Sequence, residues 1–323
     1  MRRLHRRRFL SVSLAALAGA RARPSARALA EASEKTWNPP VSVRDRHLGA
    51  AGEKDCWAAA RALGIDGLEV LVDDDLSLPG LARAEKKYSI ADERSMEELA
   101  TALERAKVKV TAFCLSNRFD ERPDLEARLT ISTVRAAKAL GVPAVRIDVV
   151  PHREAGGGFL ESTASILRKT LAETEATGVR LAVENHGSLT NRPDFLDRLF
   201  SAVESGRLGL TLDTANFYWF GHPLSRVYEL YEKYAARTFH THLKNIRYPE
   251  DARERERPMG WKYEEHVSPI DEGDIDFRRV LGILRKAGYS GDLCIEDEAL
   301  GRFPAAKHKE ILAREVRFLR SLL

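Results

Sequence analysis

The sequence predicts an α/β fold of the (β/α)8 class, in which eight parallel strands close into a barrel covered by helices. Short apolar runs alternate with stretches of helical apolar spacing along most of the chain. This alternation is typical of buried parallel strands joined by crossover helices. No GxGxxG motif follows the first run, so a nucleotide-binding doubly wound sheet has no support. Several runs end in a polar residue, and in barrels of this class the chemistry lies at the carboxyl ends of the strands.

The first thirty residues are predicted to be an export signal that precedes the fold. A twin-arginine pair at 6–7 is followed by a mild apolar stretch at 9–20 and a small-x-small motif at 26–28, the order expected of a twin-arginine signal and its cleavage site. The apolar stretch is shorter than the roughly 20 residues that span a bilayer. A basic leader with no export role is the alternative. We therefore expect a signal peptide at 1–30, a periplasmic or other extracytoplasmic location, and one barrel domain at 31–323.

Charge and cysteine content narrow the possible partners. The leader holds eight arginines and no acidic residue, so the other residues carry 44 basic against 48 acidic side chains. This mildly acidic body gives no electrostatic reason to expect nucleic-acid binding. No later segment is apolar enough for stable membrane insertion. Cys56, Cys114 and Cys294 are odd in number and lack metal-site spacing, so we expect core thiols rather than a disulfide framework.

The predicted elements alternate along the chain. Ser95 and Glu98 have the spacing of a capping box before the helix in MEELATALERA. Glycines 156–158 open another helix, and Pro193 suits the first turn of a third because its missing N–H is not needed there. The eight predicted strands are 41–48, 64–72, 108–116, 142–150, 179–185, 208–214, 237–245 and 292–298. The other predicted helices are 53–63, 125–140, 159–177, 224–236, 275–289 and 305–322.

One connection is unusually long. About thirty residues at 245–274 separate two predicted elements, and they include the charged tract EDARERER at 250–257. Loops of this length are usually functional or disordered. A lid over the site and a solvated surface insertion are both compatible with this composition.

Four residues with metal-ligand chemistry stand near the ends of successive strands in the second half of the chain. They lie in the runs LAVEN, LTLDT, THLKN and LCIED. Singly, each would be an ordinary polar strand end, but together three carboxylates and one imidazole suit a divalent ion such as Mn²⁺, Mg²⁺, Co²⁺ or Zn²⁺. Four protein ligands leave positions open for water or substrate. The predicted metal ligands are Glu184, Asp213, His242 and Glu296.

The motifs ENHG, LDTAN, HTHLKN and CIEDE resemble those of the xylose isomerase-like TIM barrels, also called the sugar phosphate isomerase/epimerase superfamily. PIDEGDIDF at 269–277 is similar to the segment before the seventh helix of that family, and the resemblance covers 41–322. It implies a single-domain TIM barrel that binds one divalent ion at the four predicted ligands. It also implies that Glu184 and Glu296 are catalytic and move a proton beside the carbonyl of a small carbohydrate or polyol, through an enediolate.

Four further residues near strand ends are predicted to bind substrate. Arg146 can contact a substrate hydroxyl or carboxylate, or instead neutralise Glu184 or Asp148. Lys244 can polarise a carbonyl, or instead form a salt bridge at the barrel mouth. The predicted substrate-binding residues are Arg146, His186, Asn216 and Lys244.

Three neighbouring positions have competing interpretations. His240 shares a strand face with the predicted ligand two residues on, and we expect it to be a core histidine. Glu298 is the alternative to Glu296 as the last ligand. His47 is a weaker candidate for the site.

These residues predict a metal-dependent sugar or polyol isomerase or epimerase. Asn216 stands where related epimerases often have a histidine, so a lyase or dehydratase acting on a keto-sugar or keto-inositol is the alternative. Export favours unphosphorylated substrates. A related abasic-site endonuclease would need more histidines and a basic groove, and a non-catalytic sugar-binding barrel would not need the ligand set. The sequence leaves the oligomeric state open, a homo-oligomer included.

Overall fold

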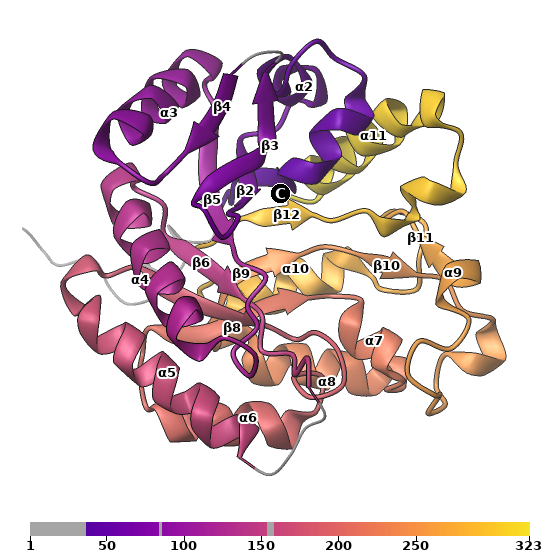
Figure 1. The fold of residues 1–323 in the computed structure, drawn as a ribbon. Coiled ribbons are helices and arrows are strands. Elements are labelled where there is room, and N and C mark those ends of the chain that lie inside the picture. Colours follow the sequence, from indigo (N-terminus) through magenta and orange to yellow (C-terminus); the bar gives the residue numbers. More distant parts are fainter. Residues whose placement is uncertain (1–36, 84–85, 154–157) are drawn as a thin grey trace, which may run out of the picture. The chain divides into compact units, whose positions relative to one another are not determined.

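Eight parallel strands form a closed ring at the centre of the molecule, with helices around them (Figure 1). The computed structural model describes residues 37–83, 86–153 and 158–323, so the predicted export segment lies outside the described residues. The strands follow the order β12-β1-β2-β5-β6-β7-β8-β9. The ring closes between its two end strands, where the Leu243 amide donates to Cys294 at 2.7 Å and the Glu296 amide donates to Leu243 at 3.1 Å. The predicted barrel is confirmed.

The barrel strands are shorter than the predicted apolar runs, because the last residues of several runs turn into the loops that form the barrel mouth. The site therefore draws on strand ends and on the loops that follow them. The barrel strands are β1 (Val41–Arg44), β2 (Gly67–Leu71), β5 (Lys109–Cys114), β6 (Ala144–Ile147), β7 (Arg180–Glu184), β8 (Leu208–Asp213), β9 (Thr238–His242) and β12 (Leu293–Ile295).

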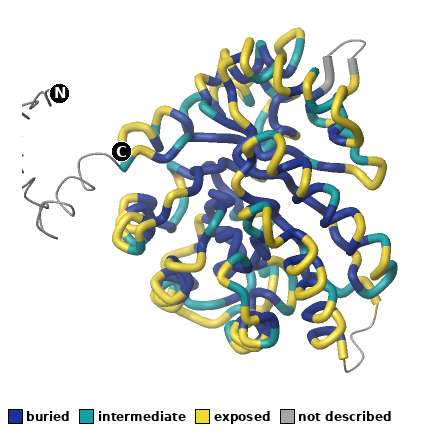
Figure 2. Tube along the Cα trace, turned by 90° about the vertical axis from the view of Figure 1, so that its left-hand side faces the viewer, coloured by how far each residue is buried: buried dark blue, intermediate teal, exposed yellow. Residues whose placement is uncertain are grey.

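The helices surround the strands with one buried and one exposed face, as Figure 2 shows by the dark inner and yellow outer sides of the coils. Their apolar residues recur at helical spacing and pack against the barrel. The α-helices are α2 (Cys56–Leu63), α3 (Glu93–Ala106), α4 (Pro123–Leu140), α5 (Phe159–Glu173), α6 (Pro193–Val203), α7 (Asn216–Phe220), α8 (Leu224–Tyr234), α9 (Tyr263–His266), α10 (Phe277–Lys286) and α11 (Ala305–Leu322).

The predicted capping box at Ser95 is wrong. Helix α3 begins at Glu93, and its cap is Asp92, whose carboxylate accepts from the Ser95 amide at 2.9 Å. The Ser95 hydroxyl donates to the same carboxylate at 2.9 Å, so Ser95 lies inside the first turn. Asp and Ser are comparable caps, and the earlier of the two starts the helix. The predicted start of α2 at Glu53 is also too early, because the helix begins at Cys56, after its cap Asp55.

A hairpin between β2 and α3 has no counterpart among the predicted elements. It consists of β3 (Ser77–Arg83) and β4 (Lys86–Ser89), which pair antiparallel. A side chain at Gly80 would overlap the carboxylate of Asp45, so this glycine lets the hairpin pack closely on the loop after β1.

The long connection 245–274 is packed against the barrel mouth. Its ends pair as the short antiparallel strands β10 (Asn245–Ile246) and β11 (Val267–Ser268). Arg257 lies over the rings of both Tyr218 and Tyr248, 4.5 Å from each centroid. The Gly260 amide donates to the Trp219 carbonyl at 2.8 Å. These contacts hold the loop on α7, the helix that follows Asp213, while most residues at 250–266 remain at least partly exposed.

The interior matches the expectation for the three cysteines. Cys56, Cys114 and Cys294 are all buried, and none of the three is in a disulfide. Among the residues that the structure describes, no helix is both long enough and apolar enough to cross a membrane.

Candidate metal centre

The four predicted metal ligands converge at the carboxyl ends of their strands. Glu184, Asp213, His242 and Glu296 each offer one atom, and these atoms all lie within 4.8 Å of one another. Nδ1 of His242 lies 3.0 Å from Oε2 of Glu296 and 3.2 Å from Oε1 of Glu184. All four side chains are buried. Four residues that are far apart in the sequence thus form one compact donor set.

Strand register explains why these residues meet. Asp213 on β8 pairs directly with His242 on β9, so parallel pairing places the two side chains at the same height. Glu184 ends β7, which pairs with β8, and Glu296 follows β12 on the far side of β9. Residues that alternate along a strand point to one face, and in a barrel that face is the interior.

The donor set fits a divalent cation. Oδ2 of Asp213 and Oε2 of Glu296 are buried oxygens that accept no hydrogen bond within the described part of the chain. The ammonium of Lys244 lies 3.0 and 2.9 Å from these two atoms. Buried carboxylates require cationic partners, and oxygen with imidazole ligands suits Mn²⁺, Mg²⁺, Co²⁺ or Zn²⁺. The particular ion is not fixed by this geometry.

Glu184 is held in its ionised form. Nε of Arg146 lies 2.7 Å from Oε2 of Glu184, and Asn216 donates to Oε1 at 3.2 Å. Burial opposes ionisation, but the charges of Arg146 and His242 outweigh it and hold the pKa of Glu184 well below its usual range. Arg146 also lies 3.5 Å from Asp148, so it neutralises both carboxylates, one of the two roles predicted for it.

Glu296 has a similar environment on the opposite side. Arg44 pairs with Oε1 of Glu296, and Lys244 pairs with Oε2. Burial again opposes ionisation, and the charges of Lys244, Arg44 and His242 hold the pKa of Glu296 well below its usual range. Both predicted proton-transfer groups are therefore carboxylates at neutral pH.

Asp213 differs from the two glutamates. Burial raises the pKa of Asp213 to about 7, and the nearby Glu184 and Glu296 charges add to this effect although Lys244 opposes it. Its other oxygen, Oδ1, accepts from the amides of Ala215 and Asn216, both at 2.9 Å. These amides fix the carboxylate, so that Oδ2 faces the other ligands.

The predicted substrate-binding residues surround this centre at different depths. Asn216 and Lys244 are buried beside the ligands. The side chain of His186 is 46% exposed, and its Nδ1 lies 3.1 Å from Asp148. His186 therefore lies toward solvent, where it can contact a ligand that enters the mouth. Their roles toward substrate remain predictions.

Glu298 lies outside the donor set, near the loop 245–274. Its Oε1 lies 3.2 Å from Nζ of Lys244 and 3.3 Å from Arg46. Its Oε2 accepts from the Tyr263 hydroxyl at 2.6 Å. The geometry thus favours Glu296 over Glu298 as the ligand, and it connects Tyr263 on the loop to Lys244 in the centre.

Two residues of the first strands were missed by sequence reasoning. Glu69 on β2 lies 2.9 Å from Nε2 of His242, and Arg44 on β1 pairs with both Glu69 and Glu296. The signal was the charged residue Glu69 within the apolar run GLEVL, where an interior partner is needed to stabilise a buried charge.

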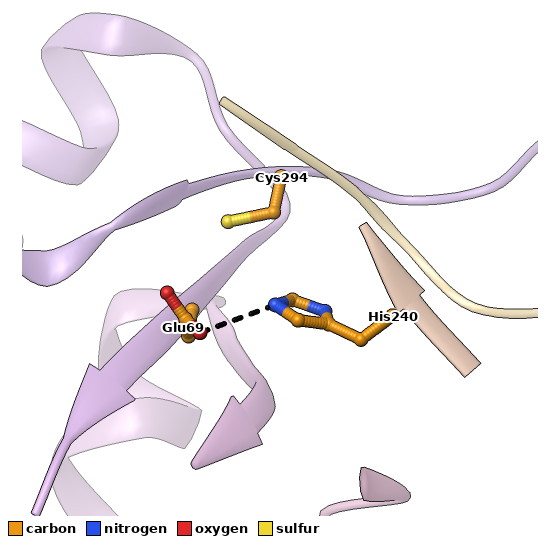
Figure 3. A group of neighbouring side chains, drawn as sticks. All are labelled: Glu69, His240 and Cys294. Atoms are coloured by element: carbon orange, nitrogen blue, oxygen red, sulfur yellow. Dashed lines mark ion pairs between the residues drawn. The ribbon is translucent and has the colours of Figure 1, made fainter. Parts of the chain in front are cut away.

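Glu69, His240 and Cys294 form a second group of potential ligand atoms below the first (Figure 3). His240 is fully buried, which confirms its assignment to the core. Arg44 already neutralises Glu69, with Nε 2.7 Å from Oε2. His240 is paired with Asp292, with Nδ1 2.6 Å from Oδ1, and burial raises the pKa of the Cys294 thiol to about 12. These features favour a charge network over a second metal site.

Sequence comparison agrees with this architecture. A model of the family described as "Xylose isomerase-like TIM barrel" matches residues 57–322. The chain belongs to this family. All four predicted ligands lie within the matched region, and the family resemblance of the motifs is confirmed.

Two curated relatives share 28% identity with part of the chain. One is an uncharacterized protein from Methanocaldococcus jannaschii, aligned over 158 residues that make up 48% of each protein. The other is an inosose dehydratase from Clostridium perfringens, aligned over 144 residues, which are 43% of this chain and 47% of the relative. The chain thus spans about half the length of these relatives.

Solved structures share the fold over most of the chain. A xylose isomerase domain protein from Planctomyces limnophilus superposes with a TM-score of 0.64 at 17% identity, covering 88% of this chain and 96% of that one. An IOLI protein with a bound zinc atom gives 0.62 at 17%, covering 87% and 97%. An L-ribulose 3-epimerase gives 0.62 at 16%, covering 88% and 95%. At these identities the likeness establishes the fold.

Proposed function

We propose that this protein is a metal-dependent isomerase or epimerase of a small sugar or polyol. The observation that carries the proposal is the convergence of Glu184, Asp213, His242 and Glu296 within 4.8 Å. A divalent ion held by them would supply Lewis-acid stabilisation of negative charge on substrate oxygens. The zinc-containing IOLI structure and the L-ribulose 3-epimerase structure share this fold, which supports the proposal.

The two glutamates are suited to moving a proton on opposite sides of the substrate. Glu184 ends β7 and Glu296 follows β12, which lie on either side of β8 and β9, so their carboxylates approach the centre from different directions. Their low pKa values make them weak bases. They can remove a proton from carbon only where that proton is acidified by a neighbouring carbonyl, which leads to an enediolate.

Lys244 is the cation best placed to donate a hydrogen bond to the substrate. Its ammonium is buried and lies 2.9 Å from Glu296. Burial lowers its pKa, but Asp213, Glu296 and Glu298 outweigh that effect and raise the pKa of Lys244 well above its usual range. It therefore stays protonated and can donate a hydrogen bond to a substrate oxygen on which negative charge develops.

A dehydratase acting on a keto-inositol or keto-sugar is the second candidate. The same ammonium could protonate a departing hydroxyl after proton removal by Glu296. Asn216 stands three residues after Asp213, where related epimerases often have a histidine, and an inosose dehydratase is among the partial relatives. The two candidates differ only in the fate of the enediolate.

Turnover by metal-free and metal-loaded protein tests the proposal. Protein treated with chelator and then reloaded with Mn²⁺ is incubated with unphosphorylated ketoses and keto-inositols, and products are identified by proton NMR. We expect conversion by the loaded protein alone, an epimer or isomer for the first candidate and a dehydrated product for the second. Sugar binding by metal-free protein, with no conversion by the loaded form, would support a binding protein instead.

We further propose that the protein is exported by the twin-arginine route. The motif at 6–7 and the apolar stretch that follows it support this proposal. Changing Arg6 and Arg7 to Lys should leave precursor in the cytoplasm, whereas Arg21 and Arg23 changed in the same way should not. Normal export of the first variant, measured by cell fractionation, would contradict the proposal.

A further inference from the structure

A chain of buried polar side chains lies beneath the predicted metal ligands. Oε1 of Glu69 lies 2.9 Å from Nε2 of His242 and 3.3 Å from Nε2 of His240. Nδ1 of His240 lies 2.6 Å from Oδ1 of Asp292, and Oδ2 of Asp292 accepts from the Ser42 hydroxyl. All five side chains are buried. The contacts therefore run continuously from the barrel interior to one predicted ligand.

The two ring nitrogens of His242 face different groups. Nδ1 faces Glu184 and Glu296, whereas Nε2 faces Glu69. An ionised carboxylate only accepts hydrogen bonds, so both ring nitrogens carry a proton when no cation is bound. Only the Nδ1 proton points at the other predicted ligands, where a divalent ion would displace it, whereas the Nε2 proton stays shared with Glu69. Nδ1 is then the nitrogen whose lone pair can face a cation. A carboxylate in this position fixes the tautomer and the orientation of a metal-binding imidazole.

Glu69 also reaches a second predicted ligand through Arg44. Nε of Arg44 lies 2.7 Å from Oε2 of Glu69, and its Nη1 pairs with Oε1 of Glu296. One carboxylate thus holds His242 directly and Glu296 through a guanidinium. Because the Glu69 side chain is fully buried, water cannot replace it in either contact.

We propose that Glu69 is a positioning residue that fixes the His242 imidazole and thereby sets the affinity of the centre for divalent ions. The inference rests on the proposed metal site, but it does not depend on which reaction the protein catalyses. His240 and Asp292 hold Glu69 from below, so their effect on the ligands is indirect.

The first test is metal affinity in the full-length protein. Glu69→Gln keeps the size of the side chain but removes its charge, and we expect the dissociation constant for Mn²⁺ to rise about 10–100-fold. Glu126→Gln is the matched control, because Glu126 is also buried and pairs with an arginine, Arg122, at 2.6 Å on α4. It should lose stability without a change in metal affinity. Equal Mn²⁺ affinity in wild type and Glu69→Gln would overturn the proposal.

The second test needs no substitution at Glu69. In zinc-loaded wild-type protein with ¹⁵N-labelled histidine, Nε2 of His242 should carry a proton and Nδ1 should not. Asp292→Asn should weaken zinc binding in the same direction as Glu69→Gln, but less. A zinc-loaded His242 with an unprotonated Nε2 would overturn the proposal even if Glu69→Gln fails to fold. Tight metal binding without sugar conversion would instead contradict only the proposed function.

Discussion

Lys244 and Glu296 form a buried ion pair in which Nζ lies 2.9 Å from Oε2. The same ammonium lies 3.0 Å from Oδ2 of Asp213. The Lys244 ammonium would therefore share the carboxylates of Asp213 and Glu296 with a bound divalent ion. We therefore expect the loss of Lys244 to have opposite effects on metal binding and on turnover.

Lys244→Met should tighten metal binding and slow the reaction. Removing a positive charge beside the site lowers repulsion, and we expect affinity to rise about tenfold, a modest part of the Coulomb energy of two charges about 4 Å apart. Turnover should fall by about 10²-fold or more, because a proton donor is lost. Metal titration and initial rates separate the two effects. Lys233→Met, which removes a surface ion pair with Asp197, is the control and should change neither quantity.

Asp213→Ala should remove most of the bound metal while the barrel stays folded. The substitution deletes the one ligand whose second oxygen is fixed by the amides of Ala215 and Asn216. Elemental analysis of purified protein should give about one ion per chain for wild type and little for the variant. Asp194→Ala removes an exposed carboxylate paired with Arg192 and should retain the ion. Full occupancy in Asp213→Ala would show that the ligand set is wrong.

Tyr263→Phe should slow turnover through the loop 245–274. The Tyr263 hydroxyl donates to Glu298 at 2.6 Å, and Glu298 contacts Lys244. A hydrogen bond to a charged group contributes about 1.5–3 kcal/mol, so a rate loss of about tenfold with little change in metal affinity is expected. Tyr234→Phe, which removes a bond to Asp197, should leave the rate unchanged. If Tyr263→Phe slowed turnover by the same factor in a Lys244→Met background, Tyr263 would act by a route that does not include Lys244.

Because His47 is buried, the metal-free protein should lose stability as the pH falls. Burial lowers the pKa of His47 to about 3, whereas the unfolded chain takes up this proton near pH 6.5. Stability therefore falls as pH falls from about 6.5 toward 3, by up to about 1.4 kcal/mol per pH unit from this group. Denaturant unfolding of His47→Gln in the presence of chelator should show a shallower loss over this range. Parallel pH profiles for the two proteins would refute the assignment.

The sequence allowed the barrel and the convergence of the four predicted ligands to be predicted, because the signals for both are local. Apolar runs such as LAVEN and LCIED mark buried strands, and Glu184 and Glu296 stand at their ends. Parallel pairing then brings every strand end to one mouth. The predicted helix at 305–322 has the same bounds in the structure.

Other features depend on contacts between distant segments. Glu69 meets His242 across 173 positions of sequence, and nothing near Glu69 indicates that partner. The docking of the long loop depends on Arg257 packing over the rings of Tyr218 and Tyr248. The start of α3 was misplaced because two suitable caps stand three residues apart.

Solvent hydrogen exchange tests the central claim, proton removal beside a carbonyl, most directly. Metal-loaded wild-type protein and its substrate are incubated in deuterated water, and deuterium at the carbon beside the carbonyl is followed by NMR. We predict incorporation by wild type, and a loss of at least about 10²–10⁴-fold in Glu296→Gln, whose amide cannot accept the proton. The proposed mechanism would be contradicted if the product kept its original proton and if Glu184→Gln and Glu296→Gln both formed product at an undiminished rate.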